Sequence, residues 1–537
     1  MEYDIREILN QLSLTEKDYI PYGFDKAKIR TEDIITSHPR KGKLILTTAI
    51  TPTKAGEGKT TTAIGLADGL KKLGYQSMTA LREPSLGPVF GVKGGGAGGG
   101  KAILEPSDDI NLHFTGDFHA ITSLNNLIAA VVDNEVYQNS SLDIDPDRIV
   151  FPRCLDMNDR ALRDIEVSRH EKREKEHDAH FVITAASEIM AIFCLAKNQE
   201  DFLDRVGNIL VAYTKEGKPV FVKDLNLRNA MVYLMHDALY PNLVQSHYHT
   251  PSLVHGGPFA NIAHGANSII ATDLALRLSD YVVTEAGFGS DLGAEKYLDI
   301  VSKKLLEHPS LVVMVVTVRA LKLHGGVKFE DLAKNDKEAM LSGSANLFKH
   351  IDNIHKYHLP VLVSINRFKD DHDDEIEALT HLLDEKGIDY AINTSYLDGE
   401  DGALELAKKA IEILNRNEDR GFSPIIHEGM TIKEKIETIS KEIYSADGVE
   451  YSKTAEKQIE EFTKLGYQDF DVCMSKVPNS LSDDPHLLNV PKGFKIHVRS
   501  LRLFTGAGFI VPLTGEVFTM PGLPKVPSCK NMKGTQH

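Results

Sequence analysis

The segment from Lys43 to Leu73 most constrains what this chain can fold into. It begins with the β-branched apolar run KLILTTAIT and continues through the loop PTKAGEGKT. Apolar residues then recur at helical spacing: Ile64, Ala67, Leu70 and Leu73. This pattern predicts a buried strand, a tight loop and a helix that Gly74 ends. SMTALRE at 77–83 predicts a second strand, which completes a β-α-β unit.

Further apolar runs recur along the chain and alternate with helical patterns. They lie near residues 181, 220, 281, 310 and 359. Strands that are apolar throughout and alternate with helices are typical of a parallel sheet covered on both faces. We therefore expect an α/β fold, with a parallel-sheet, P-loop-type nucleotide-binding core and additional α/β domains.

The loop resembles a phosphate-binding loop, although its spacing departs from G-x-x-x-x-G-K-[ST]. Gly58, Lys59 and Thr60 stand as required, but Thr53 occupies the place of the first glycine. Bare backbone amides at a helix N-terminus, with about half an elementary charge from the helix dipole, favour a phosphate there. We expect Lys59 to reach the β- and γ-phosphates and the Thr60 hydroxyl to bind Mg²⁺.

Lys54 gives the same loop a second interpretation. KAGEGKT matches the K-x-G-x-G-K-T pattern of dimeric switch ATPases, in which the first lysine reaches the partner's phosphate. A nucleotide-driven switch is therefore the alternative function. LREPSLGPVFGVKGGGAGGGK weighs against it, because Arg82 ends a strand where open α/β sheets bind ligands. A guanidinium there can hold a phosphoryl or carboxylate oxygen, and seven glycines in 91–100 allow close backbone approach.

Composition excludes several classes of partner. The net charge of −16, from 61 basic and 77 acidic residues, argues against nucleic acid as a main partner. The four cysteines are scattered, without a C-x-x-C pair, which fits a reduced compartment. No signal peptide and no apolar run of about 18 residues is present, so we expect a cytoplasmic protein without a membrane span.

Seven segments together strongly resemble formate–tetrahydrofolate ligases, also called formyltetrahydrofolate synthetases. The resemblance extends from Ile20 to Pro527. It is carried by TPTKAGEGKTTT, LREPSLGPVFGVKGG, DINLHFTGDFHAI, TPSLVHGGPFANIAHG, DYVVTEAGFGSDLGAEK, VVTVRALKLHGGV and MPGLPKVP. It implies ATP-dependent ligation of formate to tetrahydrofolate, through formyl phosphate, giving 10-formyltetrahydrofolate, ADP and phosphate. ATP, Mg²⁺, a monovalent cation (K⁺ or NH₄⁺) and a cytoplasmic homotetramer are implied as well.

The resemblance also implies roles for individual residues. Lys59 and Arg82 are expected to be catalytic, with Arg82 on formyl phosphate, and Glu83 is expected to help bind the monovalent cation. Asp117 and His119, with His113 nearby, are expected either to support a phosphate or metal or to take the N10 proton. A satisfied polar turn is the other interpretation of that segment. The nucleotide is expected to contact Thr53, Lys54, Ala55, Gly56, Glu57, Gly58, Lys59, Thr60 and Thr61.

The pterin ring is expected to lie between two aromatic side chains. Phe368 matches the first, whereas Tyr396 stands where the family has tryptophan, and the chain contains no tryptophan. Lys54 and Lys101 also depart from the family pattern, so weaker folate affinity, or a degenerate member that binds folate without turning it over, stays open. Glu285 and Asp291 are interpreted either as groups that order Mg²⁺ waters or as surface carboxylates.

The family resemblance and the apolar runs together suggest a division into domains. We expect the nucleotide-binding core in 1–100 and 240–360, an inserted α/β segment with formate- and phosphate-site loops in 101–239, and a folate-contacting C-terminal domain in 361–537.

Overall fold

A computed structural model describes most of the chain: residues 3–54, 56–93, 95–168, 176–416, 421–515 and 517–532. Within that part, the largest sheet has twelve strands. In spatial order its main path is β1 (Tyr19–Pro21), β2 (Ala27–Ile29), β14 (Asn242–Ser246), β15 (Pro251–Val254), β4 (Ser77–Leu81), β16 (Tyr281–Glu285), β3 (Lys43–Ala49), β17 (Leu311–Val316), β18 (Val361–Asn366) and β19 (Tyr390–Asn393). The hairpin β5 (Gly98–Gly99) and β6 (Ala102–Glu105) joins it at β14.

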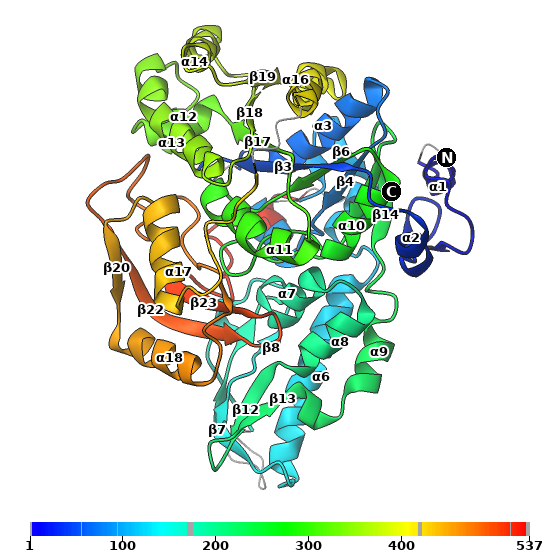
Figure 1. Ribbon diagram of the computed structural model, residues 1–537, viewed down its shortest axis with the longest axis vertical. Coiled ribbons are helices and arrows are strands. Elements are labelled where there is room, and N and C mark those ends of the chain that lie inside the picture. Colours follow the sequence, from blue (N-terminus) through cyan, green and yellow to red (C-terminus); the bar gives the residue numbers. More distant parts are fainter. Residues whose placement is uncertain are drawn as a thin grey trace.

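The strands from β15 to β19 along this path are parallel. Helices cover both faces, as Figure 1 shows. Alternation along β3 explains the two layers: Ile45 packs in one hydrophobic core with α3 (Lys59–Lys72) and α16 (Leu404–Asn415). Leu44 and Leu46 pack in the other, with α10 (Ile269–Leu278) and α13 (Lys337–His355). The α/β class is thus confirmed.

Two of the predicted strands lie outside the large sheet. β11 (Phe181–Val182) pairs with β8 (Arg153–Cys154), and β13 (Pro219–Phe221) belongs to a small antiparallel sheet with β12 (Leu210–Thr214) and β7 (Ile144–Ile149). An apolar run of three or four residues fits either kind of sheet, so the sequence pattern did not separate them.

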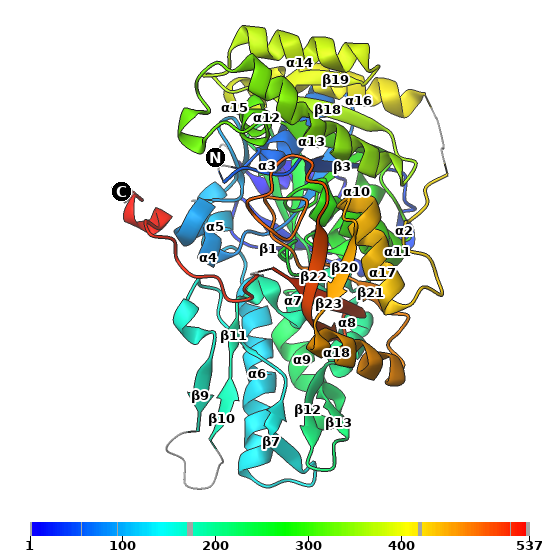
Figure 2. The ribbon, with the colours of Figure 1, turned by 90° about the vertical axis from the view of Figure 1, so that its left-hand side faces the viewer.

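The small sheet belongs to a second lobe, seen in the lower part of Figure 1. Its helices are α6 (Asp117–Tyr137), α7 (Glu188–Leu195), α8 (Gln199–Gly207) and α9 (Arg228–Met235). Figure 2 shows the hairpin β9 (Ile165–Val167) and β10 (His177–Ala179) extending at its end. Residues 169–175 of the charged segment ALRDIEVSRHEKREKEHDAH (161–180) lie outside the described residues.

The C-terminal residues form a third unit beside the large sheet (Figure 1). Its sheet contains β20 (Gly448–Tyr451), β22 (Lys495–Phe504), β23 (Phe509–Thr514) and β21 (Asp471–Val472), and α17 (Ile432–Thr438) and α18 (Lys453–Lys464) pack on it. The expected boundary at 360 falls between the paired strands β17 and β18. The division into domains stays a prediction.

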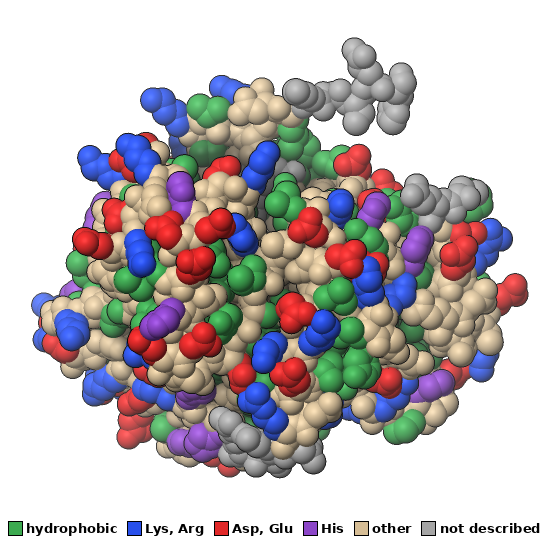
Figure 3. All heavy atoms as spheres, turned by 90° about the horizontal axis from the view of Figure 1, so that it is seen from above, with side chains coloured by type: hydrophobic (Ala, Val, Ile, Leu, Met, Phe, Trp, Pro, Cys, Tyr) green, Lys and Arg blue, Asp and Glu red, His purple; other side chains and the backbone are tan. Residues whose placement is uncertain are grey.

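The surface carries charges of both signs. Figure 3 shows Lys and Arg side chains interspersed with Asp and Glu over the face seen from above. Among the described residues, no helix is both long and apolar enough to cross a membrane.

Candidate functional site

The loop 50–58 joins the carboxyl end of β3 to the first turn of α3. Gly56 and Gly58 have φ of +79° and +76°, the left-handed region that favours glycine. Asn366, at the end of β18, donates its side-chain amide to the Glu57 carbonyl across 2.9 Å. A Cβ on Gly58 would lie 3.1 Å from that same amide nitrogen. Glycine is therefore favoured at position 58 for two reasons: the positive φ of the backbone and the closeness of the Asn366 amide.

The Glu57 side chain holds this loop from within. It is buried, and its Oε1 accepts the Thr53 backbone N–H at 2.6 Å. Its Oε2 accepts the Thr317 hydroxyl at 2.6 Å, from the residue before α12 (Val318–His324). The loop is thus fixed by the protein itself. Lys54 is exposed, and Ala55 lies outside the described residues.

Three strand ends meet around one carboxylate. β16 lies between β3 and β4, and its last residue is Glu285. The Thr60 hydroxyl, in the first turn of α3, donates to Glu285 Oε2 at 2.7 Å. Arg82, directly after β4, donates from Nε and Nη2 to Oε1 at 3.3 and 3.2 Å. The structure therefore brings Thr60 and Arg82 together through Glu285, with half-buried Lys59 and Thr61 on either side of Thr60.

Arg82 lies against a backbone that leaves room for it. A Cβ on Gly287 would stand 2.7 Å from Arg82 Nη1 and 2.7 Å from the Cβ of Ala260. The motif TEAGFGSD contains this glycine, but its spacing does not indicate why the glycine is needed. Asp291, four residues further on, is buried and pairs with Lys476 at 3.0 Å.

Glu83 and Asp117 lie in a buried charged cluster beside the site. Lys28 Nζ donates to Asp117 Oδ1 at 2.7 Å, and the Asn242 side chain donates to Oδ2 at 2.7 Å. Burial, followed by the neighbouring Asp117 charge, raises the pKa of the Glu83 carboxyl well above its usual value. Glu83 Oε2 is buried without a hydrogen-bond partner among the described residues. The raised pKa favours the neutral carboxyl, and a cation close to Oε2 would lower that pKa again. Sequence reasoning did not find Lys28.

The two predicted histidines of this segment lie elsewhere. His119 is exposed in the first turn of α6, and His113 is exposed before that helix. In the segment TPSLVHGGPFANIAHG, His255 is buried between the Ser268 hydroxyl (2.6 Å) and the Ala238 carbonyl (2.8 Å). Burial lowers the pKa of His255 to about 4, so it is a neutral core histidine at physiological pH. A Cβ on Gly257 would lie 2.1 Å from the Glu83 carbonyl oxygen.

The two aromatic residues follow β18 and β19, at the same sheet edge as the loop. Phe368 is half-buried, and the Arg319 guanidinium lies over its ring at 4.6 Å from the ring centre. Tyr396 is 51% exposed, and its carbonyl accepts the Lys101 N–H at 2.9 Å. A Cβ on Gly100, where φ is +60°, would lie 2.0 Å from that carbonyl oxygen. The glycine-rich hairpin therefore packs directly on the Tyr396 backbone.

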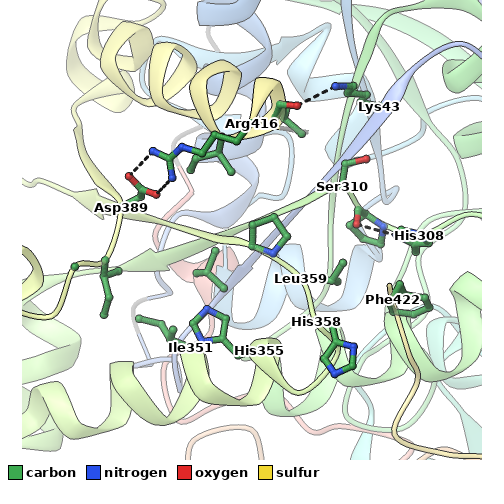
Figure 4. Close-up of a pocket in the computed structure, with 17 residues that line it drawn as sticks. Lys43, His308, Ser310, Ile351, His355, His358, Leu359, Asp389, Arg416 and Phe422 are labelled. Carbon is green, nitrogen blue, oxygen red and sulfur yellow. Dashed lines mark hydrogen bonds and ion pairs between the residues drawn. The ribbon is translucent and has the colours of Figure 1, made fainter. Parts of the chain in front are cut away.

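A cavity of about 410 Å³ lies at the opposite edge of the sheet, where β3, β17 and β18 begin (Figure 4). Lys43 and Arg416, which line the cavity, both bind other residues of the protein. Lys43 donates to the Leu414 carbonyl, and Arg416 pairs with Asp389. α16 ends beside it, and cations at helix C-termini offset the negative end of the helix dipole. These charges thus have a structural cause, and ligands of open α/β sheets bind at the other edge.

Comparisons with known proteins show the family of the chain. A family model described as formate–tetrahydrofolate ligase matches residues 1–537. A solved crystal structure of a plasmid partition protein from Borrelia burgdorferi is 14% identical, and the match covers 70% of this chain and 100% of that chain. Its TM-score of 0.23 is too low to carry an argument about fold or function.

Proposed function

The chain belongs to the formate–tetrahydrofolate ligase family, and we propose that its reaction proceeds through formyl phosphate at the carboxyl edge of the large sheet. The family's enzymes are C–N ligases that use ATP, formate and tetrahydrofolate. The observation that carries the proposal is the approach of Arg82 to the first turn of α3 through Glu285. A site for a phosphate chain and a guanidinium for a small anion thus adjoin.

The chemistry explains why both groups are needed. A formate oxygen attacks the γ-phosphorus of ATP, the bond to ADP breaks, and formyl phosphate forms. The N10 amine of tetrahydrofolate then attacks the formyl carbon, phosphate leaves, and the amine loses its proton. Two anions must meet in the first step, so cations and oriented dipoles must offset their repulsion. Lys59 and the α3 N-terminus serve the nucleotide, and Arg82 serves the formyl group.

Two cations belong to this proposal. The Thr60 hydroxyl and the Glu285 carboxylate are hard oxygen donors of the kind that Mg²⁺ takes, and Mg²⁺ there would neutralise charge on the nucleotide phosphates. Glu83, next to Asp117, would hold K⁺ or NH₄⁺ through Oε2, which is buried without a hydrogen-bond partner among the described residues, and the bound cation would offset the burial that raises the pKa of this carboxyl. Asp117 would act on the site through its contacts in this cluster. His119, which is exposed, would exchange protons with the solvent.

The aromatic residues would hold the folate. Phe368 and Tyr396 would take the pterin ring between them, and the glycine-rich hairpin on Tyr396 would cover the labile intermediate from water. The exposed ring of Tyr396 suits a group that stacks on a ligand rather than in the core. We also propose a cytoplasmic homotetramer, which rests on the family resemblance.

The switch ATPase is not favoured, because the ligase family covers the whole chain. The deciding experiment mixes the protein with MgATP, formate and tetrahydrofolate, and measures ADP and 10-formyltetrahydrofolate by chromatography. ADP release that requires both co-substrates, with stoichiometric formylated product, supports the proposal. Release with ATP alone indicates the switch. Absence of release while tetrahydrofolate still binds indicates a degenerate member.

A further inference from the structure

Arg82 already holds an anion that belongs to the protein. Two donors, Nε and Nη2, converge on the single oxygen Oε1 of Glu285, at 3.3 and 3.2 Å. Side-on arginine–carboxylate pairs usually use both oxygens, at about 2.7–2.9 Å. Here the second oxygen, Oε2, is taken by Thr60. The pair is therefore long and one-sided, and a better ligand can replace it.

The occupied edge is one that a ligand would use. Nε and Nη2 form one of the two forks with which a guanidinium grips a carboxylate or phosphoryl group. Nη1, on the other side, lies against Gly287, where a Cβ would be 2.7 Å away. Formate and the Glu285 carboxylate cannot share this fork without like-charge repulsion in a largely buried place, because the side chains are only 20% and 5% exposed.

The second partner of Glu285 links this fork to the nucleotide. Thr60 follows Lys59 in the first turn of α3, so its hydroxyl is the one that the metal-bound phosphates of a nucleotide require. Nucleotide and Mg²⁺ bound at this turn would take the Thr60 hydroxyl as a ligand of the cation and bring positive charge close to Glu285. Both changes would draw the carboxylate away from Arg82.

We propose that Glu285 is an internal anion that occupies Arg82 until nucleotide binds, so that formate binds tightly only after ATP. The inference rests on the proposed function and goes beyond it, because it assigns Glu285 a positioning role and an order to substrate binding. It also implies that Arg82 binds stray anions such as inorganic phosphate only weakly before nucleotide is present. The coupling is a free energy shared by two ligands through one side chain.

Calorimetric titration of formate tests this coupling directly. Wild type and Glu285→Gln are each titrated with and without Mg²⁺ and a non-hydrolysable ATP analogue. Glutamine keeps the size of the side chain and an acceptor for Thr60, but it has no charge to hold Arg82. We expect nucleotide to tighten formate binding to wild type about tenfold or more, within the usual range of such couplings. Glu285→Gln should bind formate tightly without nucleotide, with less than about twofold further gain.

Two further variants serve as controls for this titration. Asp68→Asn removes a buried carboxyl from the same helix, whose partners are Ser246 and Thr250, and should keep the wild-type coupling. Glu285→Asp keeps the charge but shortens the reach, so it should give an intermediate coupling even if Glu285→Gln does not fold. Equal coupling in wild type and Glu285→Gln, or none in wild type, overturns the inference.

The proposed function fails in a different way. If wild type makes 10-formyltetrahydrofolate but formate binds equally well with and without the nucleotide analogue, only the role of Glu285 is wrong. If wild type makes no 10-formyltetrahydrofolate from the three substrates, the proposed function is wrong whatever the titrations give.

Discussion

Thr60 donates its hydroxyl to Glu285 across 2.7 Å and so joins the first turn of α3 to the end of β16. The strand order makes this contact possible. β16 lies between β3, which leads into the loop, and β4, which leads into Arg82. The carboxyl ends of three neighbouring parallel strands therefore supply the turn that we propose binds phosphate, a shared carboxylate and a guanidinium. A substitution at one of these three groups should therefore alter the contacts of the other two.

Arg82→Ala should abolish the formyl group's main cationic partner. We expect kcat/KM for formate to fall by about 100-fold or more, the usual loss when one stabilising donor is removed. Arg82→Lys should recover little, because an ammonium cannot form the two-pronged contact. The assay follows 10-formyltetrahydrofolate by chromatography. Arg228→Ala, which loses only exposed contacts to Glu200 and Asp204, is the control. Unchanged formylation in Arg82→Ala would contradict the mechanism.

Glu57→Ala should loosen the nucleotide loop without touching the other substrates. The carboxylate holds the Thr53 N–H and the Thr317 hydroxyl, so its loss leaves the loop to order on the nucleotide at an entropic cost. We expect the Kd of an ATP analogue to rise about tenfold, which corresponds to about 1.4 kcal/mol. Calorimetry measures this Kd, and the KM values for formate and tetrahydrofolate, both measured at saturating ATP, serve as internal controls. An unchanged Kd would show that the loop is held by other contacts.

The strand, loop and helix from Lys43 to Lys72 were predictable because their signals are local. An apolar run, glycines and a helical period lie within thirty residues, and β3, α3 and β4 follow them closely. The partners of the site were not predictable in this way. Glu57 contacts Thr317 because β3 and β17 are neighbours in the sheet. Lys28, on β2, contacts Asp117 at the start of α6. Both contacts join residues that lie far apart in the sequence.

The partners of Phe368 and Tyr396, the two aromatic residues of the proposed folate slot, were also not predictable from local sequence. The position of Phe368 after a strand indicates the correct edge of the sheet, but nothing local indicates that Arg319 covers its ring. The glycine run suggested close approach of backbone, and the neighbour turned out to be the Tyr396 carbonyl. What a glycine makes room for depends on a segment about 300 residues away, which no period or motif encodes.

Gly100→Ala tests the contact between the hairpin and the slot. Its new Cβ would lie 2.0 Å from the Tyr396 carbonyl oxygen, at a φ of +60°, so either the hairpin or Tyr396 must move. We expect KM for tetrahydrofolate to rise about tenfold, while the Kd of an ATP analogue stays within about twofold. Gly448→Ala is the matched control, because its Cβ meets nothing within 4 Å. Equal folate kinetics in both variants would argue against the slot.

Tyr396 itself should act on folate rather than on stability. It is 51% exposed, so replacing it should change the free energy of unfolding by no more than about 0.5 kcal/mol. Tyr396→Ala should raise KM for tetrahydrofolate about tenfold, and Tyr396→Trp should lower it, because ring stacking grows with ring area. Steady-state kinetics decide this, with Tyr233→Ala, an exposed tyrosine on α9, as the control. Identical KM values in all three variants would place the pterin elsewhere.

Asp68 should make stability depend on pH. It is fully buried on α3, where Ser246 and Thr250 donate their hydroxyls to Oδ1, and burial raises its pKa to about 7 from 3.8. Between about pH 4 and 7 the folded protein keeps this proton while the unfolded chain has lost it. The contribution of Asp68 to the free energy of unfolding therefore falls as pH rises, by about 1.4 kcal/mol per pH unit, and levels off above 7.

Asp68→Asn has no proton to lose in this range. Its amide oxygen can still accept both hydroxyls, so the variant should gain stability relative to wild type as pH rises from about 4 to 7, and the difference should then stay constant. Denaturant midpoints of both proteins, measured across this range and above it, give that difference directly. A difference that stays flat from pH 5 to 7 would mean that Asp68 is ionised in the folded protein, with an additional partner for its charge.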